Sequence, residues 1–93
     1  MIIEWDAIKA RKNFSKHGVA FEEASTVFGD PLSLTIPDPV HSDAENRFIT
    51  VGVTANFKTL VVVHLDRGER IRIISARNAS LRERRTYEEG FKK

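Results

Sequence analysis

The hydrophobic pattern of the chain changes its period at Gly29-Asp30-Pro31. Before this point apolar residues recur every three or four positions, which indicates helices, and after it short runs rich in β-branched residues indicate strands. The predicted elements are a strand over 2–5, helices over 6–17 and 20–28, strands over 32–36, 47–54, 59–65 and 69–76, and a helix from residue 80. We therefore predict an α+β fold of order β-α-α-β-β-β-β-α, with a mostly antiparallel sheet, two N-terminal helices on one face and a C-terminal helix.

Length and composition predict a single domain over residues 1–93 with one small core. The chain has 41% hydrophobic residues and no cysteine, so neither disulfides nor a cysteine–zinc site can support the fold. No apolar run is longer than the four residues Leu60 to Val63, and the first residues do not resemble a signal peptide. We expect a cytoplasmic protein with no membrane partner.

Cap residues and spacing predict the ends and faces of the helices. Asp6 is placed to cap the first helix, which Gly18 ends, and Ser80-Leu81-Arg82-Glu83 is a capping-box sequence at the start of the last. In the first helix, helical spacing predicts a buried side and a solvent side. The buried side comprises Ala7, Ala10 and Phe14, and the solvent side comprises Lys9, Lys12, Asn13 and Lys16.

The last two predicted strands are joined by Asp66-Arg67-Gly68, which we interpret as a three-residue hairpin loop. This loop would place Leu65 opposite Glu69 and Val62 opposite Arg72. The register directs one set of side chains into the core: Val61, Val63, Leu65, Ile71 and Ile73. It directs another set to an open face: Val62, His64, Arg70, Arg72 and Ile74.

Charge is distributed in three blocks along the chain. Residues 9–17 carry four Lys or Arg and no acid, residues 20–46 carry six acids and no Lys or Arg, and residues 67–93 carry nine basic residues and four acids. A polyanion could bind both basic regions if the fold brings them together. Ordinary solvated faces would account for the same pattern.

The candidates for chemistry are His64, Arg70 and Arg72 on the predicted open face, with Arg77 just beyond the sheet. Arginine pairs with phosphate oxygens, and histidine can move a proton near neutral pH. The structural alternatives are a half-buried strand histidine and, for Arg72, an ion pair with Asp66 or Glu45. No two histidines have a metal-ligand spacing, so we expect no metal and no cofactor.

Other candidates each have a structural alternative. Glu83 is either a catalytic carboxylate or only the capping-box partner, and Trp5 is either a base-stacking platform or a core aromatic. His17 suits the C-terminus of a helix as a cation. His41 and Glu45 could form a proton-transfer pair or belong to a solvated loop.

Several stretches together resemble the BrnT family of bacterial toxins over nearly the whole chain. The N-terminal stretches are Glu4-Trp5-Asp6, Lys9, Asn13, Lys16-His17-Gly18-Val19, Phe21-Glu22-Glu23-Ala24, Val27-Phe28 and Asp30-Pro31. The C-terminal stretches are His41-Ser42, Glu45, Arg47, Gly52, Ile71-Arg72-Ile73-Ile74-Ser75-Ala76-Arg77, Ala79, Glu83-Arg84 and Tyr87-Glu88. One departure is the turn Ala55-Asn56-Phe57-Lys58, which lacks the glycine usual there.

The resemblance implies a type II toxin with a RelE-like fold that acts as a metal-independent endoribonuclease and arrests translation. It also implies a partner, a BrnA-like antitoxin with a ribbon-helix-helix domain, through which operator DNA would be bound. The resemblance supports residues of both motifs: Trp5, Lys9, Lys16 and His17, and Arg72, Arg77, Glu83 and Tyr87.

These considerations define the predicted site. We expect catalysis by His64, Arg72, Arg77 and Glu83, and RNA binding by Trp5, Lys9, Lys16, His17, Arg70, Arg84 and Tyr87. The antitoxin is expected to cover the open face around His64, Arg70 and Arg72 together with Arg84. The alternative from another class is a non-catalytic module that serves as a co-repressor scaffold for its antitoxin.

Overall fold

The computed structural model describes residues 1–40 and 46–90. In chain order the elements are β1 (Ile2–Trp5), α1 (Ala7–His17), α2 (Phe21–Ser25), the 3₁₀ helix η1 (Thr26–Gly29), β2 (Leu34–Pro37), β3 (Arg47–Val53), β4 (Thr59–Arg67), β5 (Arg70–Asn78) and α3 (Leu81–Glu89). The predicted α+β class is confirmed. The second predicted helix is shorter than expected and is continued by η1.

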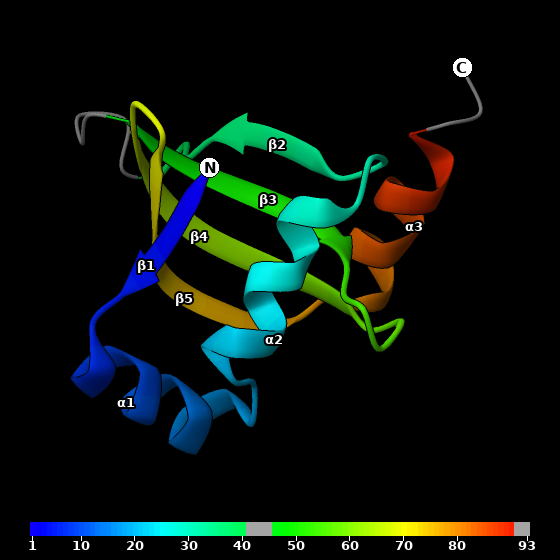
Figure 1. Ribbon diagram of the computed structural model, residues 1–93. Coiled ribbons are helices and arrows are strands. Elements are labelled where there is room, and N and C mark those ends of the chain that lie inside the picture. The colour runs from blue at the N-terminus through cyan, green and yellow to red at the C-terminus, as the bar shows by residue number, and fades with distance from the viewer. Residues whose placement is uncertain (41–45, 91–93) are drawn as a thin grey trace.

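The five strands form one twisted sheet in the order β1-β5-β4-β3-β2 (Figure 1). Strand β1 runs parallel to β5, and the other three pairings are antiparallel. The sheet is therefore mixed, and the prediction of a mostly antiparallel sheet is corrected. The first strand pairs with the last, so its direction depends on a contact across almost the whole sequence, which local turn patterns do not report.

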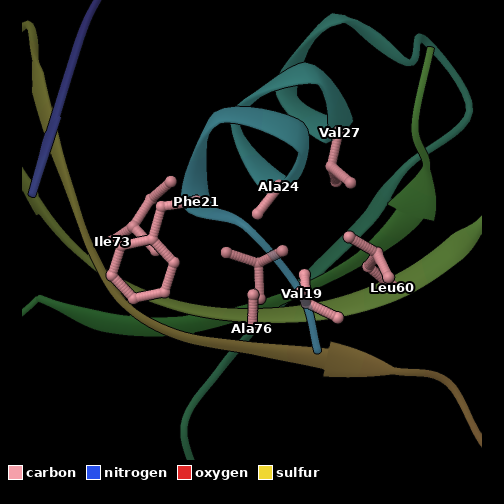
Figure 2. Packing of buried hydrophobic residues seen from close by; sticks show 8 residues of the cluster. Val19, Phe21, Ala24, Val27, Leu60, Ile73 and Ala76 are labelled. Carbon is pink, nitrogen blue, oxygen red and sulfur yellow. The ribbon is translucent and has the colours of Figure 1, made fainter. Parts of the chain in front are cut away.

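The core lies between the sheet and the helical segment that follows α1. Phe21, Ala24 and Val27 point from α2 and η1 toward the sheet, where they meet Leu60 of β4 and Ile73 of β5 (Figure 2). All five side chains are fully buried. Burial of side chains of this kind stabilises a fold by roughly 1.5–3 kcal/mol for each large one, so this cluster supplies the main driving force for folding.

Helix α1 faces the sheet through a polar residue, contrary to the prediction. Asn13 is buried, and its side-chain amide donates to the carbonyl of Ala76 at 2.8 Å and accepts from the Ala76 N–H at 3.0 Å. Phe14, predicted to be buried, is 57% exposed. Strand β1 pairs with β5 only as far as Ile73, so the backbone of Ala76 has no β1 partner. The Asn13 amide makes the hydrogen bonds that a neighbouring strand would make there, and α1 therefore presents Asn13 to the sheet.

The β4–β5 hairpin has a tighter turn than predicted. Two residues, Gly68 and Glu69, join Arg67 to Arg70, and Leu65 lies opposite Arg72 instead of Glu69. Gly68 adopts a φ of 61°, the left-handed conformation that such a turn requires. The predicted register, with Val62 opposite Arg72, is wrong, because the turn comprises residues 68–69 instead of 66–68, which moves the partner of Leu65 by three positions.

The new register reverses the faces predicted for β4. Val62 and His64 lie on the helix-covered face and are buried, whereas Arg70 and Arg72 lie on the opposite face as predicted. A register shift between Val63 and His64 leaves Ile74 as an extra residue on β5. His64 and Arg72 are therefore on opposite sides of the sheet.

The capping box of α3 is confirmed. The Ser80 Oγ accepts from the Glu83 N–H at 3.2 Å, and the Ser80 N–H donates to the Glu83 carboxylate at 2.8 Å. In the turn that lacks the usual glycine, Phe57 itself adopts a positive φ of 65° and is 89% exposed. Within the described part of the chain no helix is long and apolar enough to cross a membrane.

Candidate nucleic-acid interface

A basic groove of about 210 Å³ lies where α1 crosses the edge of β5. We call this the α1–β5 groove and define it by Lys9, Lys12, Lys16, His17 and Ser75. Helical spacing places the three lysines on one side of α1, and His17 is the last residue of the helix. The groove thus unites two predicted RNA-binding lysines, Lys9 and Lys16, with His17.

Local structure fixes the groove at both ends of α1. The Asp6 carboxylate caps the helix by accepting from the Lys9 N–H at 3.0 Å, and Gly18, with a φ of 70°, ends it. The Asn13 amide holds the middle of the helix against Ala76. Three independent contacts therefore set the position of the lysines relative to β5.

The lysines of the groove are free to meet an anion. Among the residues that the structure describes, no carboxylate lies within ion-pair distance of Lys9, Lys12 or Lys16. Three like charges without counter-charges raise the local positive potential and attract polyanions such as nucleic acid.

The arginines of β5 continue from this groove across the open face of the sheet. Arg72, Ser75 and Arg77 lie opposite Leu65, Val63 and Val61, respectively. Ser75 is therefore both a wall of the α1–β5 groove and a neighbour of the two arginines on one face of β5.

Arg70 and Arg72 share one carboxylate, that of Glu4 on the neighbouring strand β1. The Arg70 Nη1 lies 2.8 Å and the Arg72 Nε 3.3 Å from the Glu4 oxygens. Hydrogen bonds from Arg70 and then Arg72 hold the pKa of Glu4 below its usual value. Arg72 has the ion pair considered as its structural alternative, but with an acid other than Asp66 or Glu45.

Arg77 and Glu83 form a bidentate ion pair, in which Nη1 and Nη2 of Arg77 each lie 2.8 Å from a carboxylate oxygen of Glu83. The hydrogen bond from Arg77, and then that from the Ser80 N–H, lowers the pKa of Glu83 to about 2. The same bond to Glu83 raises the pKa of Arg77. Glu83 is thus ionised and engaged at neutral pH, which disfavours it as a proton donor or a strong base. Its role in the structure is to connect β5 to the start of α3.

His64 is not a member of this surface. It is buried, its Nε2 is 2.7 Å from the Thr50 hydroxyl, and its Nδ1 is 2.6 Å from the Asp66 carboxylate. The rings of Phe28 and Phe48 flank it at centroid distances of 4.9 and 6.1 Å. Because both ring nitrogens have partners and the side chain is buried, His64 fits the structural alternative of a strand histidine.

The remaining predicted residues lie apart from the groove. Trp5 packs edge-on against Phe21 at 6.1 Å, as the core alternative expects. Tyr87 is buried, and its hydroxyl donates to Asp30; burial and this carboxylate raise the pKa of Tyr87 to about 12. Arg84 is exposed on α3. His41 and Glu45 lie outside the described residues.

Two residues of the groove, Lys12 and Ser75, were not among the predicted site residues. The helical spacing of Lys12 from Lys9 and Lys16 could have identified it. No sequence signal identifies Ser75, because its position depends on the register shift in β5. Among the described residues no three side chains of the His, Asp or Glu type gather in a way that could hold a metal ion.

Comparison with known proteins identifies a matching family and a similar solved structure. The family described as "Ribonuclease toxin, BrnT, of type II toxin-antitoxin system" matches residues 5–83. The 1.1 Å crystal structure of the Brucella abortus ribonuclease toxin BrnT is similar, with a TM-score of 0.67 and 25% identity. The similarity covers 86% of this chain and 97% of the Brucella chain. No curated protein matches the sequence.

Proposed function

Because the chain belongs to the BrnT family of ribonuclease toxins of type II toxin–antitoxin systems, we propose that it is a RelE-like, metal-independent endoribonuclease that arrests translation. The observation that carries this proposal is the α1–β5 groove, in which three lysines without an ion-pair partner among the described residues, together with a histidine, meet the arginine-bearing face of β5. The positive charge of such a surface complements the negative charge of an RNA backbone.

The proposed reaction is attack of a ribose 2′-hydroxyl on the adjacent phosphorus. A base removes the hydroxyl proton, the new O–P bond forms, and the 5′-oxygen leaves with a proton from an acid, which yields a cyclic phosphate. The phosphorane between these steps carries extra negative charge. Cations held at fixed positions stabilise that charge without a bound metal.

The residues of the α1–β5 groove and its neighbours on β5 can supply these roles. Lys9, Lys12 and Lys16 bind the phosphates of the backbone, and His17 exchanges the proton in place of the buried His64. Arg72 and Arg77 provide the cations next to Ser75. Their present ion pairs are about half exposed on the arginine side, and pairs of this kind contribute only about 0–1 kcal/mol, so a phosphate can compete for the guanidinium groups.

The test of the proposed function is cleavage of total RNA by the purified protein in EDTA, with a translation extract without EDTA run in parallel. The proposal expects new 5′ ends in at least the EDTA reaction. Arg72→Ala and Arg77→Ala should each slow cleavage by roughly a hundredfold, the usual effect of removing one well-placed cation. Intact RNA in both reactions at high protein concentration would contradict the proposal.

The proposed partner is a BrnA-like antitoxin whose ribbon-helix-helix domain binds operator DNA, in the cytoplasm. The family supports an antitoxin partner in general. If DNA binding resides in the antitoxin, the isolated toxin should shift operator DNA far more weakly than the complex at physiological salt. Equal shifts would contradict this division of roles.

A second candidate function, a co-repressor scaffold without catalysis, is favoured by one observation. Three arginines of β5 on the open face are engaged, Arg70 and Arg72 by Glu4 and Arg77 by Glu83, and Glu83 is held ionised. A scaffold would leave RNA intact and still bind its antitoxin, so the same cleavage assay separates the two functions.

A further inference from the structure

An apolar groove lies on the face of the sheet opposite α2, between the sheet and α3. Leu34 and Ile36 of β2, Ile49 and Val51 of β3, and Val61 of β4 line its floor, and it has a volume of about 320 Å³. We call it the α3 groove. Ile36 is 55% exposed, so the floor continues into an apolar rim that no described element covers.

Three charged side chains line the α3 groove, namely Arg77, Arg82 and Glu83. Arg77 and Glu83 line it but neutralise each other, whereas Arg82 lines it without an acidic partner among the described residues. The guanidinium of Arg82 beside an apolar floor matches an apolar segment that carries a carboxylate.

The strand at this edge is also open. Within residues 1–40 and 46–90, β2 has a hydrogen-bonded neighbour on one side only, β3. An edge strand with exposed apolar side chains is a surface that native proteins usually cover. The α3 groove and the edge of β2 thus form one continuous uncovered surface.

We propose that the α3 groove is the docking site for an apolar, carboxylate-bearing segment of the antitoxin. This inference rests on the antitoxin partner of the proposed function and names the surface and the chemistry that would bind it. Apolar side chains of the segment fill the floor from Leu34 to Val61, and its carboxylate pairs with Arg82. The bound segment lies beside Arg77 and thereby covers part of the face proposed to act on RNA.

RNA is a poorer match for the α3 groove. Counting only residues 1–40 and 46–90, the α1–β5 groove offers three lysines without an acidic partner, whereas the mostly apolar α3 groove offers Arg82 in that state and Arg77 in an ion pair. A phosphate backbone gains most of its binding from several cations and gains little from aliphatic side chains. The two grooves therefore suit two different partners.

The antitoxin surface predicted from the sequence is only partly accessible in the fold. That surface includes Val62 and His64, which are buried beneath the helices and unavailable to a partner. Of the predicted surface, Arg70 and Arg72 are exposed on the same side of the sheet as the α3 groove but pair with Glu4.

The experiment is a binding titration between the full-length toxin and the BrnA-like antitoxin encoded with it, at low and high salt. Ile36→Glu should raise the Kd by at least about tenfold, because it places a charge on the apolar floor. The matched control is Ile8→Glu on α1, since Ile8 is 54% exposed and lies outside the groove. Arg82→Glu should weaken binding and reduce its salt dependence, with Arg85→Glu, one helical turn away, as its control.

The outcomes separate the docking site from the proposed activity. Weaker binding by Ile36→Glu and Arg82→Glu, with both controls near the wild type and RNA cleavage by free Ile36→Glu unchanged, supports the proposal. Wild-type binding by both variants, confirmed as folded by circular dichroism, overturns it. Loss of RNA cleavage with normal antitoxin binding in Ile36→Glu also overturns it and assigns the groove to RNA. A wild type that binds the antitoxin but cleaves no RNA contradicts the ribonuclease proposal alone.

Discussion

Replacement of Asn13 tests the contact that fixes the α1–β5 groove. The Asn13 side chain makes three buried hydrogen bonds, to the N–H and carbonyl of Ala76 and to the carbonyl of Val19. Asn13→Ala removes all three and leaves these backbone groups without partners. A buried polar group without a partner costs about 1–3 kcal/mol, and water entering the space left by the side chain satisfies part of the loss.

We therefore expect Asn13→Ala to lower the free energy of unfolding by about 3–5 kcal/mol, the sum of three such losses after partial hydration. For a domain of this size that loss lowers the Tm by more than about 10 °C. Asn13→Asp should be at least as harmful, because a carboxylate oxygen would then face the carbonyls of Ala76 and Val19.

The assay is urea unfolding followed by circular dichroism, with Ser15→Ala as the control because Ser15 is exposed on the same helix. The control should differ from the wild type by less than about 0.5 kcal/mol. A loss below about 1 kcal/mol in Asn13→Ala, with an unchanged m value, would refute the view that the Asn13 amide acts as a substitute strand beside Ala76.

Three further predictions concern single side chains. The pKa of Glu83 is about 2 in the fold and 4.5 without partners, so its stabilising effect is present above pH 4.5 and is lost as the pH falls toward 2. Glu83→Gln should therefore flatten the acid limb of unfolding measured between pH 5 and 2, and an unchanged limb would count against the Arg77 pair. Tyr87→Phe removes the hydrogen bond to the charged Asp30 and should lower stability by about 1.5–3 kcal/mol in urea unfolding, whereas no change would show that the bond is inconsequential. Phe57→Gly relieves a positive φ at an exposed tip and should raise stability by up to about 1 kcal/mol; destabilisation would mean that the ring has a packing role.

The features predicted correctly are those that local chemistry determines. Ser80 and Glu83 lie three residues apart, so a four-residue segment is enough to predict the capping box. The Asp6 cap and the Gly18 terminus of α1 also depend only on neighbouring residues. The shared side of Lys9 and Lys16 follows from helical periodicity alone.

The features predicted wrongly depend on contacts that are distant in sequence. The faces of β4 depended on the position and length of one turn. The resulting register error of three residues, an odd number, moved His64 from the open face to the core. Asn13 looked like a solvent residue, because its partner Ala76 is 63 positions away. The family resemblance did not reveal either contact, since it identifies residues without their register.

The α1–β5 groove is the proposed site of RNA cleavage. The direct test is the single-turnover rate of RNA cleavage in EDTA by the wild type, by His17→Gln and by Arg11→Glu, a control on the same helix but outside the groove. We expect a rate at least about a hundredfold lower for His17→Gln, the usual effect of losing an acid or base, and a near wild-type rate for Arg11→Glu. Cleavage by folded His17→Gln at the wild-type rate would contradict this expectation.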